Sequence, residues 1–549
     1  MTRPILGIAL LCILSFFETS QASWFYGRDE PDRWSVGGVW PLPADIRYLE
    51  RNRTIDPAKI GFKLDGKKHC DVLRYNAENY LNKWMFPFPV KAKGVAEDYI
   101  VIVNVVEPCP TSTPPHAANE NYELSVTKKK AVLKADTVWG AVRGMETLSQ
   151  LIFFDEKYQQ YSIRLAEVKD FPRFPVRGLM IDTSRHFLST KVIKRQIDLM
   201  AMNKMNLLHW HLVDSEAFPY ESEKFPNLHL KGAYSKRHVY SRNDVREVIN
   251  YARLRGVRVM PEFDLPGHTS SWIGQEGFLT ECFDKDMKRT WPNLVDPSNP
   301  ANFKFIDEFL DEVSRTFPDS FLHLGGDEVS DFLLECWERN EKIQHFMDDK
   351  GFANNTDLEN YFFDKLFDIV NNLELKKRMV FWQEVYDNNK PEPNSIVHVW
   401  KGNTHEEITE QVKNITEDGL DVIVSACWYL NYIKYGADWR DLISNNVESN
   451  SQYYYCDPAN FTGTQEQKSR VLGGVVAIWG EFVDNTNIES RLWPRASAAA
   501  ERLWSPAEKT TSAHEAWPRL HELRCRLVAR GFRAQPTNWP DYCPYEFDD

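Results

Sequence analysis

The chain has 549 residues, of which 42% are hydrophobic and 26% charged, and a formal net charge of −13. This composition excludes a disordered chain, and an acidic protein without a basic stripe is a poor candidate for binding nucleic acid. The length exceeds what one hydrophobic core usually organises, so we expect a small domain and a larger one of barrel size.

An apolar run near the N-terminus predicts a signal peptide. Residues 5–17 follow Arg3, and Ser20 and Ala22 are small residues at the −3 and −1 positions of a signal-peptidase site. We expect residues 1–22 to be removed, because the run is shorter than the roughly 20 residues that a membrane span needs. The mature chain is then expected in the lysosome or outside the cell, with no membrane span.

Cysteines and glycosylation triplets favour the same secretory route. Loss of Cys12 with the signal leaves eight of the nine cysteines, an even number. Disulfides form in oxidising compartments. Asn-x-Ser/Thr triplets, which suit a secreted glycoprotein, begin at Asn52, Asn354, Asn414 and Asn460.

Residues 23–170 are expected to form the smaller α/β domain. Apolar alternation predicts strands over Tyr99–Val106, Tyr122–Val126 and Ala131–Lys134, and apolar residues at three- and four-residue spacing predict a helix over Thr137–Phe153. The proline-rich stretch 171–175 interrupts regular structure. We therefore place the domain boundary there and assign residues 171–549 to a catalytic domain.

The catalytic domain reads as short apolar strands separated by helix-competent segments, the pattern of βαβ units and a parallel sheet. Eight such units close a (β/α)8 TIM barrel. The eight predicted strands are Gly178–Asp182, Asn206–Asp214, Val257–Asp264, Phe321–Asp327, Met379–Glu384, Ile396–Trp400, Val422–Ala426 and Val475–Glu481.

Polar and aromatic residues collect where these strands end. They are Arg185, Asp214, Asp264, Asp327, Glu328, Trp382, Trp400, Trp428, Tyr429, Trp479 and Glu481. Because the carboxyl ends of barrel strands form one face, the sequence predicts that eight separate segments converge on a single pocket.

The string His323-Leu-Gly-Gly-Asp-Glu328 predicts an acid catalyst. Neighbours in a pleated strand point to opposite faces, so Asp327 and Glu328 share one site only where the glycines let the chain leave the pleat. Two nearby carboxylates in a partly dry pocket raise the proton affinity of one of them. A departing glycosidic oxygen requires a protonated carboxylic acid. The alternative, without catalysis, is that Asp327 and Glu328 are simply a solvated strand end.

The tryptophans at the ends of the fifth, sixth and eighth strands suggest a sugar pocket. Indole rings stack on the C–H faces of sugars, and an N-acetyl methyl needs an apolar slot. Arg185, Asp214 and Glu481 would then hold sugar hydroxyls, although structural ion pairs at the barrel rim are an alternative.

His209-Trp-His211 suggests a different class, a metal-dependent barrel hydrolase, because side chains two apart on a strand share a face. We expect no metal and no cofactor, since Trp and Glu stand at the later strand ends where further ligands would be needed. His268, four residues after Asp264, is interpreted as a partner of the acid.

These strings together resemble glycoside hydrolase family 20, in particular the lysosomal β-N-acetylhexosaminidases of animals. The matching motifs are Asp182-Thr-Ser-Arg-His186, His209-Trp-His-Leu-Val-Asp214, Glu262-Phe-Asp-Leu-Pro-Gly-His268, His323-Leu-Gly-Gly-Asp-Glu328, Trp382-Gln-Glu384, Trp428-Tyr-Leu430 and Trp479-Gly-Glu481. The resemblance covers residues 137–545 and is weaker before them.

The resemblance implies a retaining, substrate-assisted mechanism in which the 2-acetamido oxygen of the sugar attacks the anomeric carbon. Glu328 would be the acid and base, Asp327 would hold the acetamido N–H, and an Asp264–His268 pair would tune Glu328. Tyr429 would donate a hydrogen bond to the acetamido oxygen. Trp382, Trp400 and Trp479 would enclose the acetamido group and stack on the sugar ring. Terminal GlcNAc and GalNAc glycans are the implied substrates.

The resemblance also implies disulfides Cys70–Cys109, Cys282–Cys336 and Cys525–Cys543, and it leaves Cys427 and Cys456 as a possible fourth pair. Relatives that accept charged substrates carry a basic residue just past the pocket tyrosine, where this chain has Asn431 and Tyr432. Neutral sugars are therefore expected. Related enzymes are commonly dimeric, so a homodimer is expected.

A non-enzymatic alternative is a secreted sugar-binding protein that has kept the barrel and lost catalysis. Loss of function usually removes the acid first, and Glu328 is present with every expected partner. The sequence thus favours an enzyme.

Overall fold

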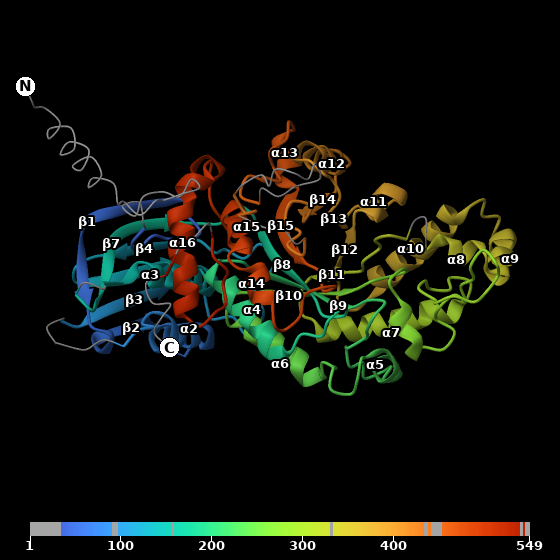
Figure 1. Cartoon of the computed structure of the whole chain (residues 1–549), viewed down its shortest axis with the longest axis horizontal. Coiled ribbons are helices and arrows are strands. Elements are labelled where there is room, and N and C mark those ends of the chain that lie inside the picture. The colour runs from blue at the N-terminus through green and yellow to red at the C-terminus, as the bar shows by residue number, and fades with distance from the viewer. Residues whose placement is uncertain are drawn as a thin grey trace, which may run out of the picture.

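The computed structural model describes residues 35–67, 69–89, 97–155, 158–329, 333–432, 437–440, 453–537 and 542–543. The predicted signal peptide, residues 1–22, lies outside the described residues. Figure 1 shows a sheet domain beside a larger barrel domain, with the red helix α16 lying across the sheet domain. Within the described ranges, no helix is both long and apolar enough to cross a membrane.

The small domain is a seven-stranded mixed sheet in the order β1-β7-β4-β5-β3-β2, with β6 paired to β7. Its strands are β1 (Asp45–Ile55), β2 (Ile60–Asp65), β3 (Tyr99–Val105), β4 (Tyr122–Val126), β5 (Lys130–Ala135), β6 (Ile152–Asp155) and β7 (Gln160–Asp170), and its helices are α2 (Asp71–Asn79) and α3 (Val138–Gln150). The three predicted strands are confirmed.

The predicted helix Thr137–Phe153 is right at its start and wrong at its end. Thr137 accepts hydrogen bonds from the backbone N–H groups of Trp139 and Gly140, as an N-cap does. The helix ends at Gln150, because Ile152–Asp155 forms β6 and pairs with β7. Every residue of α3 is buried, so its apolar spacing marks no single face and cannot fix the last turn.

The large domain is a closed barrel of eight parallel strands, which confirms the (β/α)8 prediction. The strands are β8 (Val176–Asp182), β9 (Leu207–Val213), β10 (Arg258–Phe263), β11 (Phe321–His323), β12 (Arg378–Trp382), β13 (Ile396–Val399), β14 (Asp421–Val424) and β15 (Val471–Ile478). Each corresponds to a predicted strand, and most end earlier than predicted because the polar residues leave the sheet.

The large domain also contains the remaining helices of the chain, of which all but the last lie around the barrel. They are α4 (Thr190–Met202), α5 (Asn227–Gly232), α6 (Arg242–Arg253), α7 (Pro300–Thr316), α8 (Leu334–Glu338), α9 (Glu341–Lys350), α10 (Asn355–Asn372), α11 (Glu384–Asn388), α12 (His405–Glu417), α13 (Gln465–Ser469), α14 (Ile488–Leu492), α15 (Arg495–Trp504) and α16 (Ala513–Ala529). Polar side chains cap several of them, including a capping box of Ser241 and Asp244 on α6.

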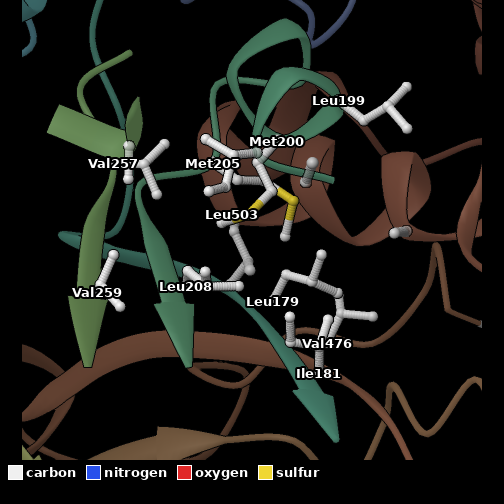
Figure 2. Close-up of a cluster of buried hydrophobic side chains, with 14 of the residues drawn as sticks. Leu179, Ile181, Leu199, Met200, Met205, Leu208, Val257, Val259, Val476 and Leu503 are labelled. Atoms are coloured by element: carbon white, nitrogen blue, oxygen red, sulfur yellow. The ribbon is translucent and has the colours of Figure 1, made fainter. Parts of the chain in front are cut away.

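The two faces of the barrel strands have different tasks. Outward side chains of β8 and β15 pack against α15, and those of β10 pack against α6. Figure 2 shows Leu179, Leu208 and Val476 beside Met200 of α4 and Leu503 of α15. Inward side chains form an apolar layer that includes Val176, Met180, Leu207, Met260, Phe321, Val380, Ile396, Ile423, Leu472, Val475 and Ala477. Above this layer, towards the carboxyl ends, the buried inward side chains are His209, His211, Glu262, His323, Trp382 and His398.

Four disulfides are present: Cys70–Cys109, Cys282–Cys336, Cys427–Cys456 and Cys525–Cys543. The three pairs that the resemblance implied are confirmed, and the two remaining cysteines form the fourth.

The C-terminal helix leaves the barrel and packs on the small domain. On α16, Arg526 donates to the backbone oxygens of Ser149, Gln150 and Ile152 at the end of α3. One turn earlier, Glu522 accepts hydrogen bonds from the backbone N–H groups of residues 37 and 38. Helix α16 is therefore tied both to residues 37–38 and to the end of α3 in the sheet domain.

Candidate active site

The predicted acid lies where β11 leaves the barrel sheet. The strand stops at His323, and Gly325 and Gly326 have φ angles of +67° and +92°. A Cβ on Gly325 would lie 1.8 Å from Oδ1 of Asp264, so only glycine fits there. Glu328 and His268 also adopt φ +55°, a costly backbone conformation that concentrates at functional sites.

Glu328 is linked to two buried side chains. Nε2 of His268 lies 3.5 Å from Oε2 of Glu328, and Nδ1 of His268 lies 3.1 Å from Oδ1 of Asp214. The expected Asp264–His268 pair is therefore replaced by an Asp214–His268 pair. The reason is the loop geometry: Oδ1 of Asp264 accepts the backbone N–H of Gly326 at 2.9 Å instead.

This arrangement sets the charges of the acid and its partner. Burial alone would lower the pKa of His268, but the carboxylates of Asp214 and Asp327 outweigh it and raise that pKa well above its usual value. The His268 imidazole, paired with Glu328 at 3.5 Å, holds the pKa of Glu328 below its usual value. The Glu328 side chain is 61% exposed, so the pocket is open above it.

The raised proton affinity expected for one acid falls on Asp327 and Asp264. Burial raises the pKa of both groups, and their mutual repulsion raises that of Asp264 further. Oδ2 of Asp264 and Oδ1 of Asp327 are buried and have no hydrogen-bond partner in the described part of the chain. The proton affinity of this buried pair of carboxyl groups is therefore raised.

The predicted aromatic residues lie together. The rings of Trp382 and Trp479 are 5.9 Å apart, and those of Trp400 and Tyr429 are 6.1 Å apart and stacked. A backbone bridge joins Tyr429 to Ala477, two residues before Trp479. The indole N–H of Trp400 donates to Glu384, which fixes the ring. Three strands and the loop after β14 thus supply one aromatic box.

The charged rim surrounds Arg185. Its guanidinium lies 2.7 Å from Asp214 and 3.1 Å from Glu216, and it stands over the Trp479 ring at 5.0 Å. Glu481 is exposed beside Trp479, and its charge acts on Arg185. Asn431 follows the box, and its Oδ1 is buried without a hydrogen-bond partner among the described residues. The site brings the candidate residues together on one barrel face, except Trp428, whose indole is buried in the core and donates to the backbone oxygen of Tyr453.

Three polar residues of the site were given no role from the sequence, although Glu262 and Glu384 stand in the quoted motifs. Glu216 pairs with Arg185, Glu384 supports Trp400, and Glu262 accepts the indole N–H of Trp382 at 2.7 Å. A signal for Glu262 existed, because it lies near the carboxyl end of β10, where the strand ends of a barrel form the active-site face.

The histidines of the metal alternative face a carboxylate. Nε2 of His209 and Nδ1 of His211 lie 2.6 and 2.7 Å from Oε2 of Glu262. His209, His323 and His398 bring nitrogens within 4.8 Å of one another, but Nε2 of His323 faces Nδ1 of His398 and Nε2 of His398 faces Ser425. The nitrogens of His323 and His398 are engaged in hydrogen bonds, whereas Nδ1 of His209 has no hydrogen-bond partner among the described residues. The group lies below the pocket.

Comparison with known proteins identifies the family. Residues 174–507 match the catalytic domain of glycosyl hydrolase family 20, and residues 39–151 match a domain described as beta-acetyl hexosaminidase like. The chain belongs to glycosyl hydrolase family 20. It is therefore a glycoside hydrolase, and its TIM barrel is the catalytic fold of that family.

Relatives of this family 20 chain align over nearly its whole length. It is 68% identical to the beta-hexosaminidase A of Caenorhabditis briggsae, with 98% of each chain covered. It is 45% identical to the human beta-hexosaminidase subunit beta, over 92% of this chain and 90% of the relative.

Solved structures share the fold. A chitobiase from Flavobacterium johnsoniae superposes with a TM-score of 0.73 at 28% identity, over 92% of this chain and 74% of the other. An exo beta-N-acetylglucosaminidase from Vibrio harveyi in complex with N-acetylglucosamine also gives 0.73, at 25% identity, over 91% and 78%.

Proposed function

We propose that this glycoside hydrolase is an exo-acting, retaining β-N-acetylhexosaminidase that removes terminal β-linked GlcNAc and GalNAc. The observation that carries the proposal is the aromatic box of Trp382, Trp400, Tyr429 and Trp479 beside the acids Asp327 and Glu328. A box of this kind suits an acetamido group, which has an apolar methyl and a polar amide. The names of the relatives support the same substrate class.

In the first step, the acetamido oxygen of the sugar bonds to the anomeric carbon as the bond to the leaving oxygen breaks. Glu328 transfers its proton to that leaving oxygen. The ionised member of the Asp327 and Asp264 pair accepts the acetamido N–H and stabilises the positive oxazolinium intermediate. Tyr429 donates its hydroxyl hydrogen bond to the acetamido oxygen and orients it.

In the second step, Glu328 removes a proton from a water molecule as that water bonds to the anomeric carbon from the face that the leaving group vacated. The bond to the acetamido oxygen breaks, and the sugar leaves with its configuration retained. One acid/base thus serves both steps, and no carboxylate nucleophile is needed.

The proton for the first step is held by His268 and Glu328 together. In the free enzyme the imidazolium carries it, which keeps the pKa of Glu328 low. A bound sugar covers the exposed Glu328 carboxylate and removes water from it. Desolvation favours the neutral acid, so the proton moves from Nε2 of His268 to Glu328.

The rim residues fit the remaining contacts of a terminal sugar. Arg185, Asp214 and Glu481 offer charged groups to ring hydroxyls, and Asn431 offers an amide without adding charge. The position of Tyr432 carries no base, which favours neutral sugars. The four disulfides support a secretory route to the lysosome or the cell exterior, and a homodimer is part of the proposal.

The test is release of nitrophenol from its β-GlcNAc, β-GalNAc and β-glucose derivatives at mildly acid pH. We expect hydrolysis of the two acetamido sugars and not of glucose, because only they carry the internal nucleophile. Glu328→Gln should lower kcat on the acetamido sugars by about 10²–10⁴-fold while sugar binding persists.

Equal hydrolysis of the glucoside would instead indicate a protein nucleophile. Sugar binding without hydrolysis of any of the three would favour the inactive sugar-binding alternative.

A further inference from the structure

Behind the site, a chain of hydrogen-bonding groups continues into the barrel. Oδ2 of Asp214 lies 2.9 Å from Nε2 of His211, and Nδ1 of His211 lies 2.7 Å from Oε2 of Glu262. Together with His268 and Glu328, these residues alternate between carboxylate and imidazole. They lead from an exposed carboxylate at the pocket to one that is fully buried.

His211 is held as an imidazolium by the carboxylates on its two sides. Burial opposes a charge on the ring, but Glu262 and Asp214 outweigh it and raise the pKa of His211 well above its usual value. Nε2 of His211 donates to Oδ2 of Asp214, and Nδ1 lies against Oε2 of Glu262 as a close ion pair without hydrogen-bond geometry. Asp214 and Glu262 remain ionised, with pKa values well below the usual range.

The two oxygens of Asp214 have separate duties. Oδ2 faces Arg185 at 2.7 Å and His211 at 2.9 Å, which leaves Oδ1 for Nδ1 of His268. Arg185 lies at the rim, where a sugar competes for its donors. His211 lies below Asp214, where no sugar reaches, so its hold on Asp214 persists through the reaction.

We propose that His211 and Glu262 are positioning residues for the acid/base Glu328 and act on it through Asp214 and His268. This inference rests on the proposed function, in which Glu328 protonates the leaving group. His211 fixes Asp214 so that His268 keeps its Nε2–H aimed at Glu328, and Glu262 keeps His211 charged.

Glu262 also connects this chain to the aromatic box. Its Oε1 accepts the indole N–H of Trp382 at 2.7 Å, while its Oε2 serves His211 and His209. One buried carboxylate thus orients both the proton donor and one wall of the pocket. The groups that face Glu262 and His211 are His209, His323, Asp214, Asp264, Asp327, Trp382 and Trp479.

The experiment compares two glycosides on each enzyme preparation. Dinitrophenyl β-GlcNAc has a leaving group that departs without protonation. The second substrate is chitobiose, whose sugar leaving group needs the acid. The ratio of the two kcat/KM values does not depend on how much of the protein is folded. His211→Gln is the variant, because a neutral glutamine cannot form an ion pair with Asp214 and Glu262.

We expect His211→Gln to lower kcat/KM for chitobiose about 10–100-fold and that for the dinitrophenyl glycoside less than about 3-fold. His209→Gln is the matched control, since His209 pairs with the same Glu262 oxygen, is equally buried and does not touch Asp214. Its ratio should equal that of the parent. Glu262→Gln is a second variant, whose amide oxygen still accepts from Trp382, and it should move the ratio as His211→Gln does.

Equal losses on both glycosides, including complete loss of the dinitrophenyl activity, would overturn the inference, as would a His209→Gln ratio that shifts as far as that of His211→Gln. Glu328→Gln separates the two levels of the argument. If it does not steepen the leaving-group dependence, the acid role itself fails. If Glu328→Gln steepens the leaving-group dependence and His211→Gln does not, only the positioning role of His211 fails.

Discussion

Single buried residues make the folded state of this protein more stable at acid pH, and Glu359 on α10 is the clearest case. Its side chain is buried, and its Oε1 has no hydrogen-bond partner in the described ranges. Burial, and then the charge of Glu384, raise its pKa to about 7. Glu384 supports Trp400 of the aromatic box, so the charge of Glu359 is felt next to the pocket wall.

The sign of the pH effect follows from proton binding. Between the unperturbed pKa of 4.5 and the folded value of about 7, the folded state holds a proton that the unfolded state has lost. The free energy of unfolding therefore decreases as pH rises through this window, by an amount on the order of 3 kcal/mol from this one group.

Glu359→Gln should remove this decrease in the free energy of unfolding at high pH. We expect a higher Tm than the parent at about pH 8 and an unchanged Tm at about pH 4, because the protonated acid and the amide are both neutral. Thermal unfolding across pH measures this. Glu410→Gln, at an exposed position of α12, is the control and should leave Tm unchanged at both values. A parallel shift of the Glu359→Gln curve at all pH values would contradict the assignment.

At the scale of elements, the exit of β11 decides whether the acids reach the pocket. Gly325→Ala adds a Cβ both in a left-handed conformation, which costs about 1–2 kcal/mol, and within 1.8 Å of the Asp264 carboxylate. The second effect must displace Asp264, Asp327 or both. We expect a lower Tm and a loss of kcat on an aryl β-GlcNAc of at least about 100-fold, the scale of a lost acid catalyst.

Gly351→Ala separates backbone strain from displacement. Gly351 follows α9 with a φ of +71°, close to that of Gly325, and a Cβ there meets no atom within 4 Å. This variant should lose about 1 kcal/mol of stability and keep its kcat. A Gly325→Ala enzyme with normal kcat would show that the loop accommodates the methyl without moving the acids.

The sequence predicted these elements to different degrees, for physical reasons. The eight barrel strands were predictable because strands buried on both faces are apolar runs, and the pocket residues were predictable because they follow those runs. The last turn of α3 was not, since the helix is buried on all sides and the apolar run Leu151–Phe153 that continues its pattern belongs to the turn and β6. The Asp214–His268 pair was not either, because it depends on the left-handed backbone at His268, which brings together two different strand ends.

At the scale of the whole molecule, buried charges join the two domains. Asp170, the last residue of β7, accepts hydrogen bonds from Nζ of Lys204 at 2.7 Å, from Tyr122 at 2.6 Å and from the indole N–H of Trp504 at 3.0 Å. Lys204 and Trp504 belong to the barrel domain. Glu120 of the small domain lies 2.5 Å from Arg177 of β8. With α16 across the sheet, these contacts should make the two domains unfold together.

Lys204→Met tests this coupling. The Lys204 and Asp170 side chains are both fully buried, and removing one partner of a buried ion pair typically costs 3–5 kcal/mol, so Tm should fall by several degrees in calorimetry. Because the contact joins both domains, the variant should keep one transition. Its kcat should match the parent below Tm, since Lys204 precedes β9 at the barrel end opposite the pocket.

Adding Asp170→Asn to Lys204→Met should recover part of the lost stability, because the unpaired buried charge is then gone. Two separate transitions in the parent protein would show instead that the sheet domain folds and melts on its own.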